Sequence, residues 1–327
     1  MISLKALKPG RFNWKEFLIR RMMIILLGIM IVFIAINRPV FLTTDNLLNV
    51  LRQIAVNAVI AYGMTFVIIT GGIELSVGSV VALSGCVTAG MMKYYGMPIP
   101  AAIAIGLLMA GIAGFVNGAI IAGFKVPPFV ITMATQTICR GFAYVFTDGR
   151  PIVELPKLFL RIGRGKVGGE AGFLPWPVLI MLMIMAVMCL LLYKTKFGRY
   201  IFAVGGNEDA ARVSGINTKK VKIIAYTLCG LLAGIAGILL SSRIDAGQPQ
   251  AGVAYETDAI AATVIGGTSL SGGVGSMYGT MVGAIIIGVV NNGLNLLAIN
   301  QYYQMIVKGM IIAFAVIVDT FASKKYK

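Results

Sequence analysis

The sequence has no histidine, only 12 acidic residues among 327, and four cysteines that stand singly within apolar runs. The absence of histidine excludes histidine-based acid–base catalysis, histidine metal sites and histidine proton relays. Cys86, Cys139, Cys189 and Cys229 form no CxxC pair, so we interpret them as small buried hydrophobes. No constellation of nucleophile, base or metal ligands remains, which argues against an enzyme.

Charge is also scarce. Only 12% of the residues are charged, against about 25% in soluble domains, while 58% are hydrophobic. The mean hydropathy is +0.89. Apolar runs of about 20 residues are typical of membrane-spanning helices, and the length leaves room for about eight to eleven of them. We therefore predict an all-α polytopic membrane protein.

The apolar runs and the charged, glycine and proline residues between them predict about ten transmembrane helices. The predicted spans are residues 20–37, 50–70, 77–95, 99–121, 127–147, 175–193, 220–241, 257–270, 275–298 and 301–320. The eighth is the shortest. A transmembrane domain is thus expected over 20–320, between an N-terminal segment, 1–19, and a tail, 321–327.

The net charge of +16 comes mostly from Lys and Arg outside the apolar runs, as the positive-inside rule requires, and does not indicate nucleic-acid binding. The N-terminal segment, residues 194–222 and the tail are rich in these cations. With ten spans all three fall on one side, which predicts that both termini are cytoplasmic. The loop 148–174 then lies outside, although it carries five basic residues. Its glycine and proline content indicates an ordered surface loop, to which we assign no role.

Small residues recur at four-residue spacing on three of the predicted helices. Such faces let helix backbones approach closely in lipid and indicate a compact bundle. The positions are Gly106, Ala110, Gly114 and Gly118; Gly230 and Gly234; and Gly275, Gly279 and Gly283. The stretch "GGIELSVGS" at 71–79 is echoed by "GGTSLSGGVGS" at 266–276, which reflects either an internal duplication or a shared bias toward glycine and serine.

Neutral polar residues share faces on several predicted spans. Interhelical hydrogen bonding, worth about 0.6 kcal/mol a pair, is one explanation. A path for an uncharged, hydroxyl-rich solute is the other, because an ion path would show more acidic residues in mid-span. The candidate pathway residues are Gln53, Asn57, Thr65, Glu74, Ser76, Thr132, Gln136, Arg140, Asn291, Asn292 and Asn295; Gln301, Gln304 and Lys308 share a further face.

Glu74 stands in the glycine-rich stretch between the second and third spans. Ser76 can cap the following helix, and a carboxylate near that helix end is favourable. Irregular backbone at membrane depth is tolerated only where protein or a water-filled cavity surrounds it. Both a capping role and a role at a gate or path therefore remain open for Glu74.

The basic segment 194–219 contains a predicted short helix over Glu208–Ser214. Asn207 is a suitable N-cap, the two acids that follow suit a first helical turn, and Gly215 suits the stop. The helix is either an ordinary connector or a docking element for another protein.

Three stretches, "GMTFVIITGGIELSVGS", "GGNEDAARVSGI" and "DAIAATVIGGTSLSGGVGS", resemble the permease subunits of bacterial monosaccharide ABC importers. The closing run "NNGLNLLAINQYYQMIVKGMII" is most similar to the ribose-type members. The resemblance covers nearly the whole chain. Glu74 is a departure, because the family usually has aspartate there, and the added methylene changes the reach of the carboxylate in that turn.

The resemblance implies the vitamin-B12-importer-like (type II) ABC permease fold, a permease dimer, and a bacterial inner-membrane location. It also implies an ATP-binding subunit and a periplasmic sugar-binding protein as partners. The segment expected to dock into the ATPase comprises Gly206, Asn207, Glu208, Asp209, Ala210, Ala211, Arg212, Ser214 and Gly215. The chain lacks GxxxxGK[ST], so we expect no ATPase site and no cofactor on it, with ATP and Mg held by the partner.

The implied mechanism is alternating access, in which a loaded binding protein docks outside and ATP-driven movement reopens the bundle inward. Ribose is the leading substrate, while xylose, allose, galactose and a quorum-sensing furanose remain open. The rival from another class is a stand-alone carrier coupled to protons or sodium. It would need a coupling site, and the sequence offers no histidine and no carboxylate in mid-span.

Overall fold

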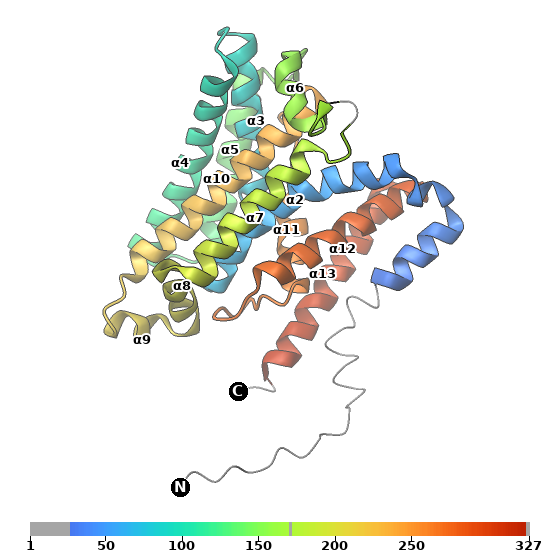
Figure 1. Cartoon of the computed structure of the whole chain (residues 1–327). Coiled ribbons are helices and arrows are strands. Elements are labelled where there is room, and N and C mark those ends of the chain that lie inside the picture. Colours follow the sequence, from blue (N-terminus) through green and yellow to red (C-terminus); the bar gives the residue numbers. More distant parts are fainter. Residues whose placement is uncertain (1–26, 170–171, 325–327) are drawn as a thin grey trace.

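Each of the predicted spans contains a helix in the computed structural model, which describes residues 27–169 and 172–324 (Figure 1). The first apolar helix is described over Leu27–Asn37, and the predicted N-terminal segment lies outside the described residues. The other elements are η1 (Pro39–Leu42), α2 (Thr44–Ile69), α3 (Val77–Lys93), α4 (Ile99–Phe124), α5 (Pro128–Thr147), β1 (Ile152–Val153), α6 (Lys157–Arg164), α7 (Trp176–Lys194), α8 (Lys196–Gly206), α9 (Glu208–Val213), α10 (Thr218–Ile244), β2 (Ala246–Gly247), α11 (Tyr255–Ile265), α12 (Met277–Leu296) and α13 (Gln301–Lys324).

Among the described residues, 6 helices are long and apolar enough to cross a membrane: α2, α4, α5, α7, α10 and α12. This supports a multi-pass, mainly helical membrane protein. The predicted eighth span, 257–270, is wrong in its extent. Helix α11 has 11 residues, about 16 Å at 1.5 Å each, which is too short for a hydrocarbon core of about 30 Å. It ends because Gly267 has a φ of 86°, in the left-handed region that stops helices.

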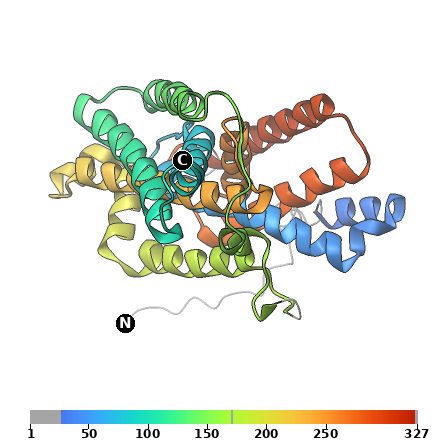
Figure 2. The ribbon, with the colours of Figure 1, turned by 90° about the horizontal axis from the view of Figure 1, so that it is seen from above.

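Helix α2 passes through the middle of the bundle. Its second half, residues 58–69, is apolar on nearly every face, and Tyr62, Phe66 and Ile68 are completely buried. An apolar helix must be covered by lipid or by other helices, and this part of α2 is covered by other helices. Figure 2 shows the bundle from above, with the start of α2 and α12 toward one side and α4 with the start of α10 toward the other.

The predicted close approach of small residues is confirmed where α4 crosses α10. A Cβ placed on Gly230 would lie 3.0 Å from the Cα of Gly114 and 2.5 Å from the carbonyl oxygen of Ala110. Gly279 and Gly283 of α12 bring that helix against the backbone of α11 in the same way. Larger side chains at these positions would force the helices apart.

The two ends of the bundle carry different structures (Figure 1). At one end, β1 pairs with β2 in an antiparallel register that sets Ile152 opposite Gly247. Helix α6 packs beside them, where the hydroxyl of Ser242 donates to the carbonyl of Phe159 at 2.6 Å. The described residues of the predicted outer loop, 148–169 and 172–174, therefore have a defined structure, and they lie at the end of the bundle opposite α9.

Candidate functional site

A polar cavity of about 290 Å³ lies where α2, α10, α11, α12 and α13 meet. This volume is at the lower end of the range for small-molecule sites. Amides predominate in its wall, beside one acid and two cations. The lining residues are Gln53, Asn57, Leu240, Arg243, Ile244, Tyr255, Asp258, Gly288, Asn291, Asn295, Gln304 and Lys308.

Two hydrogen-bond acceptors in this cavity are unused. Within the described part of the chain, Oε1 of Gln53 and Oδ1 of Asn291 are buried and have no hydrogen-bond partner. A buried polar atom without a partner costs free energy, and such atoms in native structures usually serve a ligand or a water. Both are oxygens, so they can accept hydrogen bonds from the hydroxyl groups of a solute.

The cavity wall also contains a buried ion pair that the sequence analysis did not select. Nζ of Lys308 lies 3.1 Å from Oδ2 of Asp258, which also accepts from Nδ2 of Asn291 at 3.1 Å. The Asp258 side chain is only 4% exposed. The signal in the sequence was a lone lysine within the apolar run 301–320, because intramembrane charges are rare and usually find a partner.

The structure brings together four of the predicted pathway residues, namely Gln53, Asn57, Asn291 and Asn295. Gln304, from the additional polar face, joins them and donates to Oδ1 of Asn295 at 2.9 Å. These side chains come from α2, α12 and α13, so their meeting depends on the packing of helices far apart in the sequence.

Thr65 and Asn292 do not reach the cavity. The Thr65 hydroxyl lies 2.8 Å from that of Thr280 and bridges α2 to α12. Asn292 exchanges two hydrogen bonds, of 3.0 and 3.1 Å, with Asn46. For these two residues, interhelical hydrogen bonding accounts for the polar side chain.

Gln136 and Arg140 form a separate group at the start of α11. Nε2 of Gln136 donates to Oε1 of Glu256 at 3.3 Å. The guanidinium of Arg140 donates to the carbonyl of Ala251 at 2.7 Å and to that of Pro249. Arg140 thus fastens the segment before α11 to α5, which is a structural use of the charge.

The carboxylate of Glu74 is buried in a network between α3, α4 and α5. It accepts from the backbone N–H and the hydroxyl of Ser76, at 2.7 and 2.6 Å, and from Nδ2 of Asn117 at 2.7 Å. Thr135 extends the network by donating to Oδ1 of Asn117 at 2.5 Å. Thr132 lies nearby, with its hydroxyl 3.5 Å from the carbonyl of Ile73.

This geometry favours the capping interpretation of Glu74 but reverses the roles within the pair. Ser76 makes no side-chain cap hydrogen bond, because its backbone has helical angles and its hydroxyl donates to the carboxylate. The Glu74 side chain, which is longer than serine, satisfies the donor at this helix end instead. Neither residue lines the cavity.

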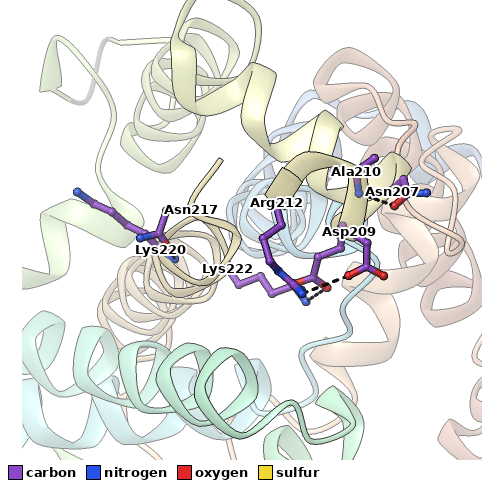
Figure 3. A network of polar contacts seen from close by, with 8 residues as sticks. Asn207, Asp209, Ala210, Arg212, Asn217, Lys220 and Lys222 are labelled. Carbon is purple, nitrogen blue, oxygen red and sulfur yellow. Dashed lines mark hydrogen bonds and ion pairs between the residues drawn. The ribbon is translucent and has the colours of Figure 1, made fainter. Parts of the chain in front are cut away.

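The short helix predicted over Glu208–Ser214 is observed as α9, one residue shorter (Figure 3). Oδ1 of Asn207 accepts from the N–H of Ala210 at 2.9 Å, as expected of an N-cap. The helix stops at Gly215, which has a φ of 84°. The N–H of Ile216 then donates to the carbonyl of Ala211 at 3.0 Å, the pattern of a glycine-stopped helix end.

An ion pair fixes α9 to the start of α10, because Nζ of Lys222 lies 2.6 Å from Oε2 of Glu208. A second ion pair, between Arg212 and Asp209 at 3.3 Å, lies within α9 itself. Burial opposes the charge of Glu208, but hydrogen bonds from Lys222 and Thr218 and the nearby cations outweigh it and lower its pKa. The segment is therefore built to keep this carboxylate ionised.

The predicted docking residues in and around α9 differ in their exposure to solvent. Ala211 is only 5% exposed and packs against the bundle, so it anchors the helix and presents no surface. Val213, which the prediction omitted, is 90% exposed. Gly206, Asn207, Asp209, Ala210, Arg212, Ser214 and Gly215 are also exposed, and Glu208 is intermediate. A hollow of about 680 Å³ adjoins the helix beside Lys125 and Lys219.

Comparisons with known proteins agree with this architecture. A family model described as "Branched-chain amino acid transport system / permease component" matches residues 46–316. A ribose import permease protein of Haemophilus influenzae is 46% identical over 322 residues, which cover 97% of this chain and 98% of that protein. The ribose import permease protein of Bacillus subtilis is 48% identical over 90% of each chain. The D-allose transport system permease protein of Escherichia coli is 37% identical, over 92% and 91%.

No solved structure is a significant match. The family match extends from α2 to within α13, so it includes the cavity, the glycine crossings and α9. The chain therefore belongs to the family of transport-system permease components that this model describes, and it is a relative of bacterial ribose and allose permeases.

Proposed function

We propose that this chain is the membrane-spanning permease subunit of an ATP-driven monosaccharide importer, with ribose as the leading substrate. The observation that carries the proposal is the polar cavity with its two unused acceptors, Gln53 Oε1 and Asn291 Oδ1. Relatives named as ribose import permeases, at 46% and 48% identity over most of the chain, support the choice of sugar.

In this proposal the partners are an ATP-binding subunit, a periplasmic sugar-binding protein and a second copy of the permease. Helix α9 is the docking element for the ATPase, because its exposed residues project from one end of the bundle and its buried Ala211 anchors it. ATP and Mg are bound by the ATP-binding subunit. The permease itself provides the route and no catalytic group.

The finer architecture belongs to the same proposal. The chain has ten spans in the type II ABC permease fold and lies in the bacterial inner membrane with both termini in the cytoplasm. The position of the 148–174 loop at the end opposite α9 supports this arrangement. The short α11, followed by the glycine-rich stretch 266–276, forms an incomplete span, as is common where helices break around a transport path.

Sugar passes through the cavity by transient hydrogen bonds. Amide oxygens accept from sugar hydroxyls, and amide N–H groups and the Lys308 ammonium donate to sugar oxygens. Each such bond contributes about 0.5–1.5 kcal/mol, so the site can bind and release the solute without holding it. Alternation of access follows from movement of the bundle, driven by the ATPase through α9.

The test is uptake by proteoliposomes that contain the permease with its ATP-binding subunit and binding protein. Labelled ribose should accumulate only when ATP and the binding protein are both present. The same assay with labelled xylose, allose or galactose shows whether any of these sugars is also taken up. Accumulation by the permease alone, driven by a proton or sodium gradient, would overturn the proposal.

That outcome would favour a stand-alone ion-coupled carrier. The observation in its favour is the buried Asp258–Lys308 pair, an intramembrane carboxylate that could in principle bind a coupling ion. The lysine already neutralises this carboxylate, which leaves no free acid in the cavity wall, and for this reason we prefer the importer.

A further inference from the structure

Two hollows at the α6 end of the bundle share part of their lining. One, of about 640 Å³, is lined by Arg161, Arg164, Lys166, Trp176 and neighbouring glycines. The other, of about 470 Å³, is apolar and lined mainly by Ile99, Pro100, Leu158, Ile162 and Ile180. Arg161 and Trp176 border both. A cationic pocket therefore continues directly into an apolar groove.

The groove lies at the boundary of the apolar zone. Ile99 and Trp176 are the first residues of α4 and α7, which are both long and apolar enough to cross a membrane. Ile180 is about one turn further along α7. Tryptophan at a helix end is typical of the headgroup level of a bilayer. The cations thus lie at headgroup level, and the apolar groove runs toward acyl-chain depth.

The local structure holds this arrangement in place. The N–H of Gly163 donates to Oγ of Ser242 at 2.8 Å, and Phe159 is completely buried, so one face of α6 is fixed to α10. The opposite face then presents Arg161 and Leu158, the latter 64% exposed.

Lys166 is held by a small turn. Its bridge to Pro175 and the hydrogen bond from the N–H of Trp176 to the carbonyl of Gly165, 3.1 Å, set it over the start of α7. The backbone therefore fixes the position from which the Lys166 side chain borders the pocket.

We propose that this composite groove binds an anionic phospholipid. Arg161 and Lys166 contact the phosphate, Trp176 lies at the glycerol level, and one acyl chain follows Leu158, Ile162 and Ile180. Arginine and lysine bind phosphate through charge-assisted hydrogen bonds. The continuous apolar extension favours a lipid over a soluble acidic protein, because a protein surface would match the cations but leave the groove open.

The proposal gives a role to Arg161 and Lys166, two of the five basic residues on a loop that the positive-inside rule would leave poor in cations. Arg164 is partly engaged, since its Nε donates to the carbonyl of Arg243 at 2.8 Å. Arg161 and Lys166 are the better cations to test, because neither makes a side-chain hydrogen bond or ion pair within the described residues. The inference does not depend on the transported sugar.

The experiment uses the purified, delipidated full-length permease, with phosphatidylglycerol as the probe and phosphatidylcholine as the neutral comparison. Native mass spectrometry counts retained lipid. The wild type should retain phosphatidylglycerol several-fold better than phosphatidylcholine. Arg161→Gln with Lys166→Gln should abolish that preference, and Leu158→Asn should lower phosphatidylglycerol retention while the charges stay in place.

The matched control is Arg150→Gln with Lys157→Gln, which removes two cations from the same loop outside both hollows and should leave the preference unchanged. An equal loss of the phosphatidylglycerol preference in this control would mean that the total positive charge of the loop attracts the lipid, whatever its position, and would overturn the proposal. So would full retention by the Arg161–Lys166 variant.

Two further outcomes also reject the lipid. The first is displacement of phosphatidylglycerol by inorganic phosphate at comparable concentration, which would indicate a site for the phosphate group alone. The second combines two measurements on the variant Arg161→Gln with Lys166→Gln. In phosphatidylcholine nanodiscs this variant would lose affinity for the sugar-binding protein, while native mass spectrometry would show that it still prefers phosphatidylglycerol. That result would assign the surface to a protein partner.

Discussion

At the scale of single residues, the amide side chains of the bundle differ in whether they keep a hydrogen-bonding atom that could bind a solute. Asn291 and Asn292 are neighbours on α12, yet Asn292 uses both ends of its side chain on Asn46, while Oδ1 of Asn291 is buried without a partner. The two side chains point to different faces of the helix. They therefore form a natural pair for separating transport from packing.

We expect Asn291→Ala to lower sugar uptake per folded molecule between about twofold and tenfold, which corresponds to the loss of one neutral hydrogen bond to the sugar. It should also lower stability, because Nδ2 of Asn291 donates to Asp258. Gln53→Ala should act similarly, because its Oε1 is also unused. Asn292→Ala should instead reduce thermal stability with little effect on uptake per folded molecule. The measurement is the uptake rate normalised to the amount of assembled complex. Equal losses of uptake in the Asn291 and Asn292 variants would contradict the assignment of Asn291 to the sugar path and Asn292 to helix packing.

The Asp258–Lys308 pair makes a second residue-scale prediction. Removing one member of a buried ion pair leaves an uncompensated charge, at a cost of about 3–5 kcal/mol. Asp258→Leu or Lys308→Met alone should strongly lower the unfolding temperature of the detergent-solubilised permease. The double variant should recover most of the loss, because two apolar groups then face each other. Additive losses in the double variant would show that the two residues are not coupled.

At the scale of elements, α9 is a six-residue helix whose position depends on its ends and its ion pairs. Gly215→Val places a β-branched residue at a φ of 84°, which distorts the stop. We expect this variant to insert in the membrane but to lose co-purification with the ATP-binding subunit. Gly141→Ala on α5 is the control, since it lies outside the docking segment, nothing lies within 4 Å of its added Cβ and its φ is not positive. Normal association of the Gly215 variant would make α9 a mere connector.

The charge on Glu208 gives α9 a defined pH dependence. Its pKa is lowered in the folded state, so its stabilising contribution is complete above the ordinary value of 4.5 and is lost as the pH falls below it. The segment should therefore be insensitive to pH across the neutral range. Glu208→Gln, which mimics the protonated form, should increase proteolytic cleavage around α9 at neutral pH. Unchanged cleavage would show that the Lys222 ion pair is not needed.

The crossing of α4 and α10 is the other element on which the fold depends. Gly114→Val would push a side chain into the backbone of α10 at Tyr226 and Gly230, and we expect it to abolish the folded protein. Gly123→Val lies on the same helix with nothing within 4 Å of the added Cβ, and should be tolerated. Monodispersity on size-exclusion chromatography after detergent extraction separates the two. A folded Gly114 variant would contradict the close crossing.

At the scale of the whole molecule, the prediction concerns which end faces which compartment. Single cysteines at Val153 and Ser214, placed in a background without the four native cysteines, should label from opposite sides of the membrane. Both positions are exposed. Position 153 should react in intact cells, and position 214 only after permeabilisation. Labelling of both from outside would overturn the ten-span arrangement.

The sequence by itself determined the class of protein, the place of the helices in the apolar runs, the small-residue faces that α4 and α10 use where they cross, and the ends of α9. These features depend on neighbours along the chain: apolar runs of sufficient length, small residues at four-residue spacing, and capping residues beside a helix. The same local rules explain the wrong extent of the eighth span, because the residues after Ile265 carry no charge to mark the end of a span, while the backbone turns at Gly267.

Only the tertiary structure decided which polar residues share a site. Gln53, Asn291 and Lys308 come from three helices, and whether each faces the cavity or a neighbouring helix depends on how those helices are rotated and packed. Thr65 and Asn292 are also polar residues within apolar runs, but they form interhelical hydrogen bonds and do not line the cavity. The periodicity of a single helix identifies a polar face, but the partner of that face is set by long-range packing, which no local pattern encodes.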